Sequence, residues 1–236
     1  MYKHFFKRII GFLGALVAIV LLSPLFFVVT IWLHFANKGA GAFFFQIRPG
    51  VGGKPFKCIK YKSMTDEIGA DGNLLPDKDR ITTIGRFIRK FSIDELPQLF
   101  NILKGDMAFI GPRPLGMTYI PYFNEEEMHR HDVRPGITGW AQVNGRTALD
   151  WPNRMRLDLE YVNNLSLWLD IKIFFLTIYK VFKRENIGEG SSGVLSFYDY
   201  RDAQWAAEGR YDLIKETYIK SGRTKPNKFL ENLDEK

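Results

Sequence analysis

The chain has 236 residues, with 33 Lys and Arg against 26 Asp and Glu and a formal net charge of +7. This length allows one sizeable core with appendages, and the basic balance favours anionic partners such as phosphate groups or lipid headgroups. The single Cys58 excludes an internal disulfide and, with only scattered histidines, argues against a structural zinc site.

Residues 9–35 are the most apolar part of the chain and contain no Asp, Glu, Lys or Arg. An uncharged apolar run of more than about 18 residues predicts a helix inside a lipid bilayer. The run is too long for a secretory signal, whose apolar core spans about 7–15 residues. Pro24 at its centre lacks a backbone donor and predicts a kink, and the Ser23 hydroxyl can bond a carbonyl that is freed there.

Both flanks of this segment are basic. Because loops rich in Lys and Arg prefer the cytoplasmic side, the flanks favour a re-entrant helix whose two ends share that side. An ordinary spanning helix with a proline kink is the alternative. The flanking cations are Lys3, Lys7 and Arg8, followed by Lys38, Arg48, Lys54, Lys57, Lys60 and Lys62.

After the membrane segment, glycine and proline punctuate two short apolar runs, 43–47 and 55–61, which predicts a small β-hairpin. The polar stretch 66–80 predicts a solvent loop. Beyond it, apolar residues at helical spacing predict that helices dominate. The expected helices are 84–91, 96–103, 125–131, 151–163 and 167–183.

The last of these helices is apolar nearly all round and flanked by lysines, which suits an interfacial amphipathic helix on anionic lipid headgroups. Packing inside the core is the alternative. Residues 191–193 (Ser-Ser-Gly) indicate a linker, and residues 201–220 a mixed-charge helix. The expected fold is therefore mixed α/β and mostly α. It comprises a re-entrant membrane helix with its basic flank (1–38), a small cytosolic catalytic domain (39–190) and an accessory tail (191–236).

Two adjacent carboxylates, Asp94 and Glu95, form the first candidate site. Because proline is tolerated only in the first turn of a helix, Pro97 predicts a helix start near 92–94. Ser92 and Glu95 have the spacing of a capping box, which is a purely structural interpretation. The functional interpretation is that amides at the helix start attract a phosphate while a carboxylate attacks it or holds a metal.

Two further segments carry candidate ligands for phosphate. Arg113 lies between Pro112 and Pro114, which restrict its backbone and suit bidentate phosphate binding; a stiff exposed turn is the alternative. Residues 134–146 combine three glycines with arginines, amides and an aromatic side chain, and such loops can bind phosphate, sugar and base edges. The candidate contacts in this loop are Arg134, Gln142, Asn144 and Arg146.

Asp77 and Asp79 form a D-x-D tripeptide, which many metal-dependent glycosyltransferases contain but which is also common by chance. It supports an alternative function, a metal-dependent glycosyltransferase that releases UDP. A second alternative is a non-enzymatic membrane scaffold in which Ser92 and Glu95 only cap a helix. Nucleic acid is not an expected partner, because the basic residues follow the membrane segment and the site loops and form no stripe interleaved with aromatic residues.

Six motifs occur in order along the chain: Ser23-Pro24, Phe56-Lys57-x-x-Lys60-Tyr61-Lys62-Ser63-Met64, Ser92-Ile93-Asp94-Glu95-Leu96-Pro97-Gln98, Leu103-Lys104-Gly105-Asp106-Met107, Gly111-Pro112-Arg113-Pro114 and Arg134-Pro135-Gly136-Ile137-Thr138-Gly139. Together they resemble the monotopic phosphoglycosyl transferases of the bacterial sugar transferase family. The resemblance spans roughly residues 3–190, and the short chain is similar to the minimal members of that family.

The resemblance implies a re-entrant membrane helix and a two-step reaction at the cytoplasmic face of the bacterial inner membrane. Asp94 would attack the β-phosphate of a UDP-sugar, release UMP and carry the sugar-phosphate as an acyl phosphate, while Glu95 helps to hold Mg²⁺. Undecaprenyl phosphate would then attack this intermediate. Lys60, Arg89, Arg113 and Asp170 fall at family positions suited to the phosphates and the metal environment.

The implied partners are a UDP-sugar, undecaprenyl phosphate and anionic lipid headgroups, and a homo-oligomer stays open. An N-acetylated sugar, diacetamido sugars included, is favoured only through the minimal members. The chain departs from the family pattern in two places. Gly11 stands where members commonly carry an Asp after the first Lys-Arg pair, and the tail after residue 190 is longer than in the minimal members.

Overall fold

The computed structural model describes residues 1–145, 149–183, 195–223 and 227–231. These residues form two compact units. Unit 1 comprises Met1–Ile47 and Phe56–Phe109, and unit 2 comprises Arg48–Pro55 and Ile110–Lys236. The fold is mixed α/β and mostly helical, as predicted, with one long apolar helix at the N-terminus. The three-part domain division remains a prediction.

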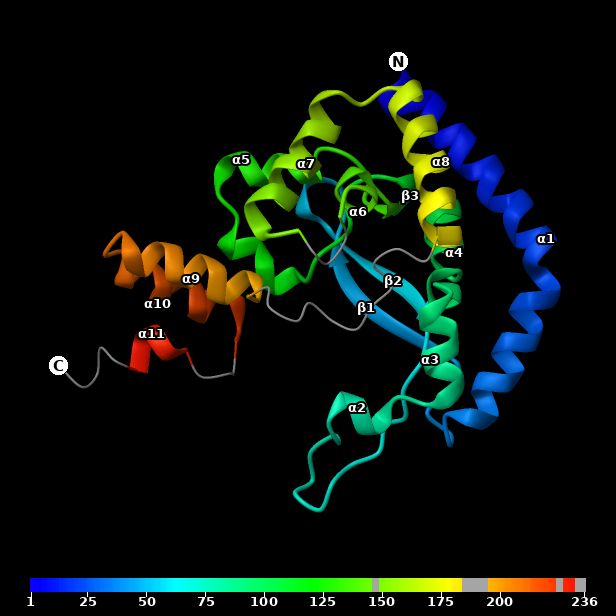
Figure 1. Ribbon diagram of the computed structural model, residues 1–236, viewed down its shortest axis with the longest axis horizontal. Coiled ribbons are helices and arrows are strands. Elements are labelled where there is room, and N and C mark those ends of the chain that lie inside the picture. The colour runs from blue at the N-terminus through cyan, green and yellow to red at the C-terminus, as the bar shows by residue number, and fades with distance from the viewer. Residues whose placement is uncertain (146–148, 184–194, 224–226, 232–236) are drawn as a thin grey trace. The chain divides into compact units, whose positions relative to one another are not determined.

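The first element of unit 1 is a π-helical turn (Tyr2–Phe6), which continues into α1 (Lys7–Ala36). Figure 1 shows that α1 is continuous but bowed along its length, as expected for a helix with an internal proline. The Ser23 hydroxyl donates to the Val20 carbonyl at 2.8 Å. Pro24 has no N–H for that carbonyl, so the predicted compensation by Ser23 is confirmed.

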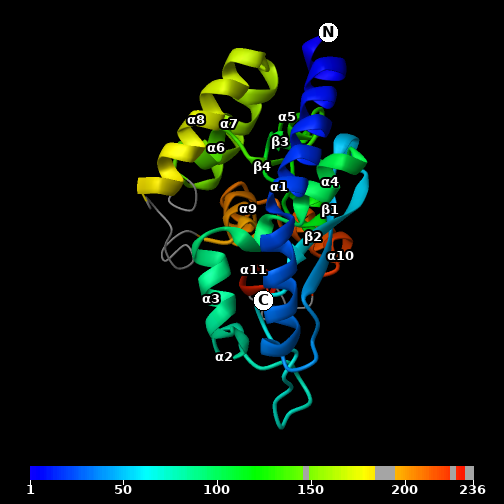
Figure 2. The same ribbon diagram turned by 90° about the vertical axis from the view of Figure 1, so that its right-hand side faces the viewer.

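Most of α1 is apolar and exposed. It is the one helix among the described residues that is long and apolar enough to cross a membrane, and only 11% of its most apolar window is buried. A core helix of a water-soluble protein would be mostly buried, so this exposure fits membrane association. The buried positions Gly11, Ala15, Val29 and Leu33 face the rest of unit 1, where α1 packs against α4 (Gln98–Lys104) (Figure 2).

The predicted hairpin is present as β1 (Phe43–Pro49) and β2 (Pro55–Tyr61), which form a two-stranded sheet. The stretch 66–80, predicted as a loop, contains an antiparallel bridge between Ile68 and Leu74 and the short helix α2 (Asp77–Arg80). Then follow α3 (Thr83–Lys90), the 3-10 turn η3 (Ile93–Glu95) and α4.

A second two-stranded sheet, which the sequence pattern did not predict, pairs β3 (Ala108–Ile110) with β4 (Gly136–Thr138). The unit 2 helices α6, α7 and α8 lie together, with α6 packing against both others (Figure 2). The expected helix 125–131 ends early and continues as a 3-10 turn. The helical bounds are η4 (Met117–Tyr122, 3-10), α5 (Glu125–Met128), η5 (His129–His131, 3-10), α6 (Trp140–Val143), α7 (Trp151–Asn163) and α8 (Leu167–Lys183).

The tail forms α9 (Phe197–Ala207), α10 (Tyr211–Ser221) and α11 (Lys228–Glu231). A single helix over 201–220 was therefore a wrong prediction. Gly209 adopts φ +71°, a left-handed conformation that ends α9, and the chain turns before α10 begins. The expected linker 191–193 lies outside the described residues.

Candidate active site

Asp94 and Glu95 lie in a strained turn between two helices. Ser92 adopts φ +55°, and its side chain makes no capping hydrogen bond. The left-handed residue separates α3 from α4, so the carboxylates occupy the 3-10 turn η3 and α4 begins only at Gln98. The predicted helix start near 92–94 and the capping box are therefore wrong. A non-glycine residue in this conformation costs about 1–3 kcal/mol, and such strain is concentrated at functional sites.

Lys60 on β2 pairs with one of the two carboxylates, Glu95. Its ammonium lies 2.9 Å from Glu95 Oε1, and the two side chains are 22% and 13% exposed. Partial burial strengthens this ion pair over a surface pair. The ion pair orients Glu95, while the role predicted for Lys60 towards phosphate and metal stays a prediction.

Arg89 is oriented by a close packing of α3 on the segment after β2. Its Nε donates to Ser63 Oγ at 2.7 Å. Gly85 permits this packing, because a Cβ at that position would lie 1.9 Å from the Ser63 carbonyl oxygen. The glycine therefore brings α3 down onto Ser63, and Arg89 is held at the end of the helix that leads into η3.

Asn101 joins α4, the helix that follows Asp94 and Glu95, to β2, the strand that carries Lys60. It is fully buried on α4, its Oδ1 accepts from the Ile59 amide at 3.0 Å, and its Nδ2 donates to the Lys57 carbonyl at 2.7 Å. The sequence interpretation missed this residue. An amide on the otherwise apolar face of a predicted helix was the available signal, since a buried polar group must find partners.

Arg8 fastens the apolar helix α1 to the C-terminal end of α4. Its guanidinium donates to the carbonyls of Ile102 and Leu103, at 2.5 and 2.6 Å. A cation there satisfies terminal carbonyls and complements the helix dipole. Gly11 lies one turn further along α1, where an added Cβ would meet Ile102 at 3.6 Å. Gly11, which stands where family members commonly carry an Asp, thus packs against α4.

Two motifs in unit 2 interlock through their backbones. A Cβ on Gly111 would lie 2.3 Å from the Arg134 carbonyl oxygen, and one on Gly136 would lie 2.2 Å from the Gly111 nitrogen. The Gly111 amide donates to Thr138 at 2.9 Å, and the Gly136 amide donates to Pro112 at 3.0 Å. These glycines therefore permit close backbone contact, and the predicted role of the loop in binding a ligand stays a prediction.

Arg113 is exposed, and its backbone is tied down by residues that the sequence interpretation missed. Arg130 donates to the Arg113 carbonyl at 2.9 Å and pairs with Asp158 at 2.7 Å, with both charged side chains almost completely buried. Breaking a buried pair by removing one partner typically costs about 3–5 kcal/mol. Because Asp158 lies on α7, the pair anchors the Arg113 loop to that helix.

Gln142, Asn144 and Asp170 make hydrogen bonds within unit 2, and their roles in binding a ligand stay predictions. Gln142 donates to the Ile137 carbonyl and Asn144 to the Trp140 carbonyl, each at 2.8 Å. Asp170 is buried at the start of α8 and accepts from the Tyr161 hydroxyl at 2.7 Å. Arg134 is half-buried beside β4. Arg146 lies outside the described residues.

Within the described residues there is no group of three or more His, Cys, Asp or Glu side chains that could hold a metal ion. Mg²⁺ nevertheless commonly binds through one or two carboxylates together with substrate phosphates and water. Glu95 beside Asp94 is compatible with this mode of binding. Asp77 of the alternative D-x-D site instead pairs with Arg80 at 2.6 Å and is largely exposed.

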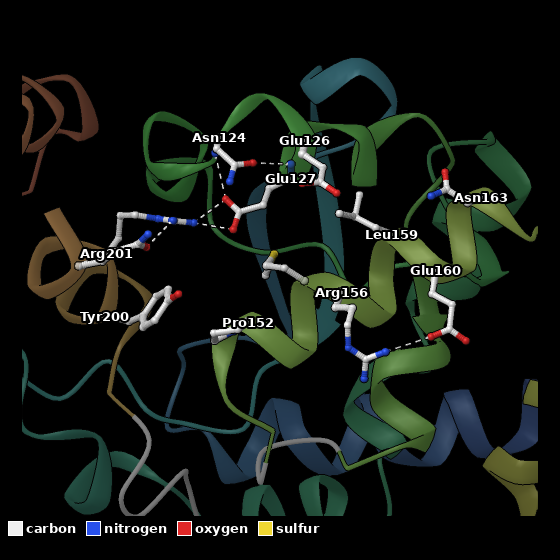
Figure 3. Close-up of a pocket in the computed structure, with 12 residues that line it drawn as sticks. Asn124, Glu126, Glu127, Pro152, Arg156, Leu159, Glu160, Asn163, Tyr200 and Arg201 are labelled. Carbon is white, nitrogen blue, oxygen red and sulfur yellow. Dashed lines mark hydrogen bonds and ion pairs between the residues drawn. The ribbon is translucent and has the colours of Figure 1, made fainter. Parts of the chain in front are cut away.

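A separate cavity of about 500 Å³ lies in unit 2 between α5, α7 and α9 (Figure 3). Its lining includes Glu127, Arg156, Glu160 and Arg201, and none of the predicted site residues. Figure 3 shows Arg201 of α9 directed towards Glu127 and Arg156 paired with Glu160. The cavity therefore marks the junction of the tail with the rest of unit 2.

The family model described as bacterial sugar transferase matches residues 2–184. The uncharacterized sugar transferase EpsL of Bacillus subtilis (strain 168) is 56% identical over 149 residues, which cover 63% of this chain and 74% of the relative. A UDP-N-acetylgalactosamine-undecaprenyl-phosphate N-acetylgalactosaminephosphotransferase of Aeromonas hydrophila is 43% identical, with 74% of this chain and 43% of the relative covered. A UDP-glucose:undecaprenyl-phosphate glucose-1-phosphate transferase of Klebsiella pneumoniae is 38% identical, with 75% and 40% covered.

The chain therefore belongs to the bacterial sugar transferase family, and the family predicted from the motifs is confirmed. The chain spans less than half the length of the Aeromonas and Klebsiella relatives. The tail helices α9 to α11 lie beyond the residues that the family model matches.

Proposed function

We propose that the chain transfers a sugar 1-phosphate from a UDP-sugar to undecaprenyl phosphate and releases UMP, which starts the assembly of a glycoconjugate. The observation that supports this proposal most directly is the strained turn at Ser92, which is followed by Asp94 and Glu95. Lys60 pairs with Glu95 there at 2.9 Å. The relatives whose names specify undecaprenyl-phosphate sugar phosphotransferases support this reaction.

In the first step an Asp94 carboxylate oxygen attacks the β-phosphorus of the donor. The bond from that phosphorus to the bridging oxygen breaks, UMP leaves, and an acyl phosphate joins Asp94 to the sugar. In the second step a phosphate oxygen of undecaprenyl phosphate attacks the same phosphorus and restores the carboxylate. A carboxylate nucleophile thus divides one difficult phosphoryl transfer into two easier ones.

The other residues of unit 1 have supporting roles in this proposal. Lys60 orients Glu95, and Arg89, held by Ser63, adds positive charge near the turn. Glu95 is the proposed protein ligand of Mg²⁺, which when bound neutralises charge on the transferred phosphate. In unit 2, Arg130 fixes the backbone of Arg113, and the Arg113 guanidinium is proposed to bind a phosphate of the donor.

We further propose that α1 enters the cytoplasmic membrane as a re-entrant helix. Its exposed apolar surface, its bowed course and its basic flanks support this arrangement. The exposed aromatic residues of α8, among them Trp168, Phe174 and Phe175, together with Lys180 and Lys183, support an interfacial role for that helix.

The donor sugar is proposed to be N-acetylated. Support comes from the Aeromonas relative, whose name specifies N-acetylgalactosamine, whereas other relatives are named for glucose or galactose. An assay over a panel of UDP-sugars decides between them.

The test measures UMP and UDP released by the purified chain with Mg²⁺, undecaprenyl phosphate and each donor. We expect UMP with at least one donor, and its loss in Asp94→Asn. The double variant Asp77→Asn/Asp79→Asn is the matched control and should retain activity. Release of UDP, or loss of activity only in the Asp77/Asp79 variant, would favour a metal-dependent glycosyltransferase. No nucleotide from any donor would favour a membrane scaffold.

A further inference from the structure

The C-terminal tail packs onto η4, the segment that follows the Arg113 motif. Phe197, the first residue of α9, is completely buried. The centroid of its ring lies 5.4 Å from that of Tyr119 and 4.9 Å from that of Trp151. Buried aromatic contacts of this kind stabilise beyond the area that they bury. The start of α9 is therefore an integral part of the aromatic core of unit 2.

The next residue, Tyr198, holds η4 along its length. Its ring lies 4.5 Å from Tyr119 and 5.3 Å from Tyr122, and its hydroxyl is hydrogen-bonded to Thr118. Arg223, which follows α10, also contacts both residues. Its guanidinium lies 4.4 Å from the centroid of the Tyr198 ring and donates to the Tyr122 hydroxyl at 3.1 Å. Both ends of η4 are thus bonded to the tail.

The tail is also fixed at a second point, on α5. Arg201 on α9 donates to both carboxylate oxygens of Glu127, at 2.5 Å each (Figure 3). The two side chains are 5% and 12% exposed, so the ion pair is shielded from solvent. Through this pair, α9 is braced against α5.

The Arg113 segment lies between two anchors. On its N-terminal side, backbone hydrogen bonds with Thr138 and Gly136 hold the chain to β4. On its C-terminal side, η4 begins at Met117, only a few residues beyond Pro114. Only Leu115 and Gly116 separate Pro114 from η4, and Leu115 packs against the same aromatic cluster as Phe197. Because prolines flank Arg113 and stiffen its backbone, we expect a displacement of η4 to reach Arg113.

We propose that α9 is a positioning element of the substrate site: Phe197 and Tyr198 fix η4, and η4 fixes the loop from which Arg113 binds phosphate of the nucleotide-sugar. The inference rests on the proposed function for the ligand of Arg113. It assigns a role to a tail that lies outside the family match, and it makes Tyr198 a positioning residue that never touches the substrate.

The test compares full-length Tyr198→Ala, Tyr198→Phe and Gln204→Ala well below their melting temperatures. Tyr198→Phe keeps the ring contacts, and Gln204 lies on the same helix but lines the cavity on the α5 side. We expect Tyr198→Ala to raise the KM for the donor at least ~5-fold with a smaller change in kcat, since uniform binding is lost. Tyr198→Phe and Gln204→Ala should stay within ~2-fold of wild type. Unchanged donor KM in folded Tyr198→Ala, or an equal effect of Gln204→Ala, would overturn the proposal.

Hydrogen–deuterium exchange provides a readout that does not need activity. Tyr198→Ala should speed exchange in peptides covering 112–122, because local opening there becomes easier. Unchanged exchange would overturn the proposal, even if wild type released UMP. If wild type released no nucleotide, faster exchange would still support the positioning role while the proposed function failed. Should Tyr198→Ala not fold, Tyr198→Leu replaces it with the same expectations.

Discussion

Gly111→Ala tests whether the glycines of unit 2 permit backbone contact. An added Cβ would lie 2.3 Å from the Arg134 carbonyl oxygen, whereas real Cβ atoms almost never come within 3.0 Å of another atom. The two backbones must therefore part by about 0.7 Å or more, which weakens the hydrogen bonds that link them at Thr138 and Gly136. Two lost bonds at about 1 kcal/mol each and overpacking of about 1–3 kcal/mol predict a destabilisation of about 3–5 kcal/mol.

The assay is thermal unfolding of Gly111→Ala in detergent, with Gly116→Ala as the matched control. A loss of that size corresponds to a fall in Tm of roughly 10 °C for a chain of this length. Gly116 has φ −67°, and its Cβ would first meet the Thr118 hydroxyl at 3.3 Å, where a shift of a few tenths of an ångström relieves the contact. Its substitution should shift Tm by less than ~2 °C. Equal Tm values for the two variants would refute the reasoning.

Three further predictions follow from single contacts. Lys60→Met should lower UMP release at least ~10-fold, because Glu95 loses the partner that orients it, while Lys60→Arg retains more activity; equal rates would contradict this. Burial, aided by the nearby Arg130 charge, lowers the pKa of His131 from 6.5 to about 4. The unfolded chain therefore binds this proton more readily than the folded chain. The contribution of neutral His131 to the free energy of unfolding is present above pH 6.5 and is lost towards pH 4, by about 2 kcal/mol from pH 7 to 5. His131→Gln should flatten that pH dependence of Tm, and an unchanged slope would exclude His131 as its source. Arg8→Leu should lower Tm by a few degrees and Arg8→Lys by less, whereas no shift would argue against the contact with α4.

The long elements of the fold could be predicted because their patterns are local. The predicted bounds of α7 and α8 match the structure, and the hairpin β1–β2 lies where glycine and proline placed it. The bond from Ser23 to Val20 was also predictable, since proline removes a known donor at a known spacing. Each of these features depends on residues that are close in sequence.

The errors arose where distant residues decide the conformation. Ser92 has the sequence of a cap, but it adopts a left-handed conformation that ends α3 before η3 begins. The strands β3 and β4 were missed because each has only three residues and their pairing depends on glycines far apart in the chain. Asn101 and the Arg130–Asp158 pair were missed for the same reason: a buried polar side chain reveals its role only through its partners.

The central claim is a covalent intermediate on Asp94, and mass spectrometry of the chain incubated with its UDP-sugar and Mg²⁺, without undecaprenyl phosphate, tests it most directly. We predict a mass increase equal to one phosphosugar, located on the peptide that contains Asp94 and absent from Asp94→Asn. Addition of undecaprenyl phosphate should discharge the adduct. Turnover in the complete reaction with no adduct on Asp94 at any time, and with UDP in place of UMP, would contradict the account.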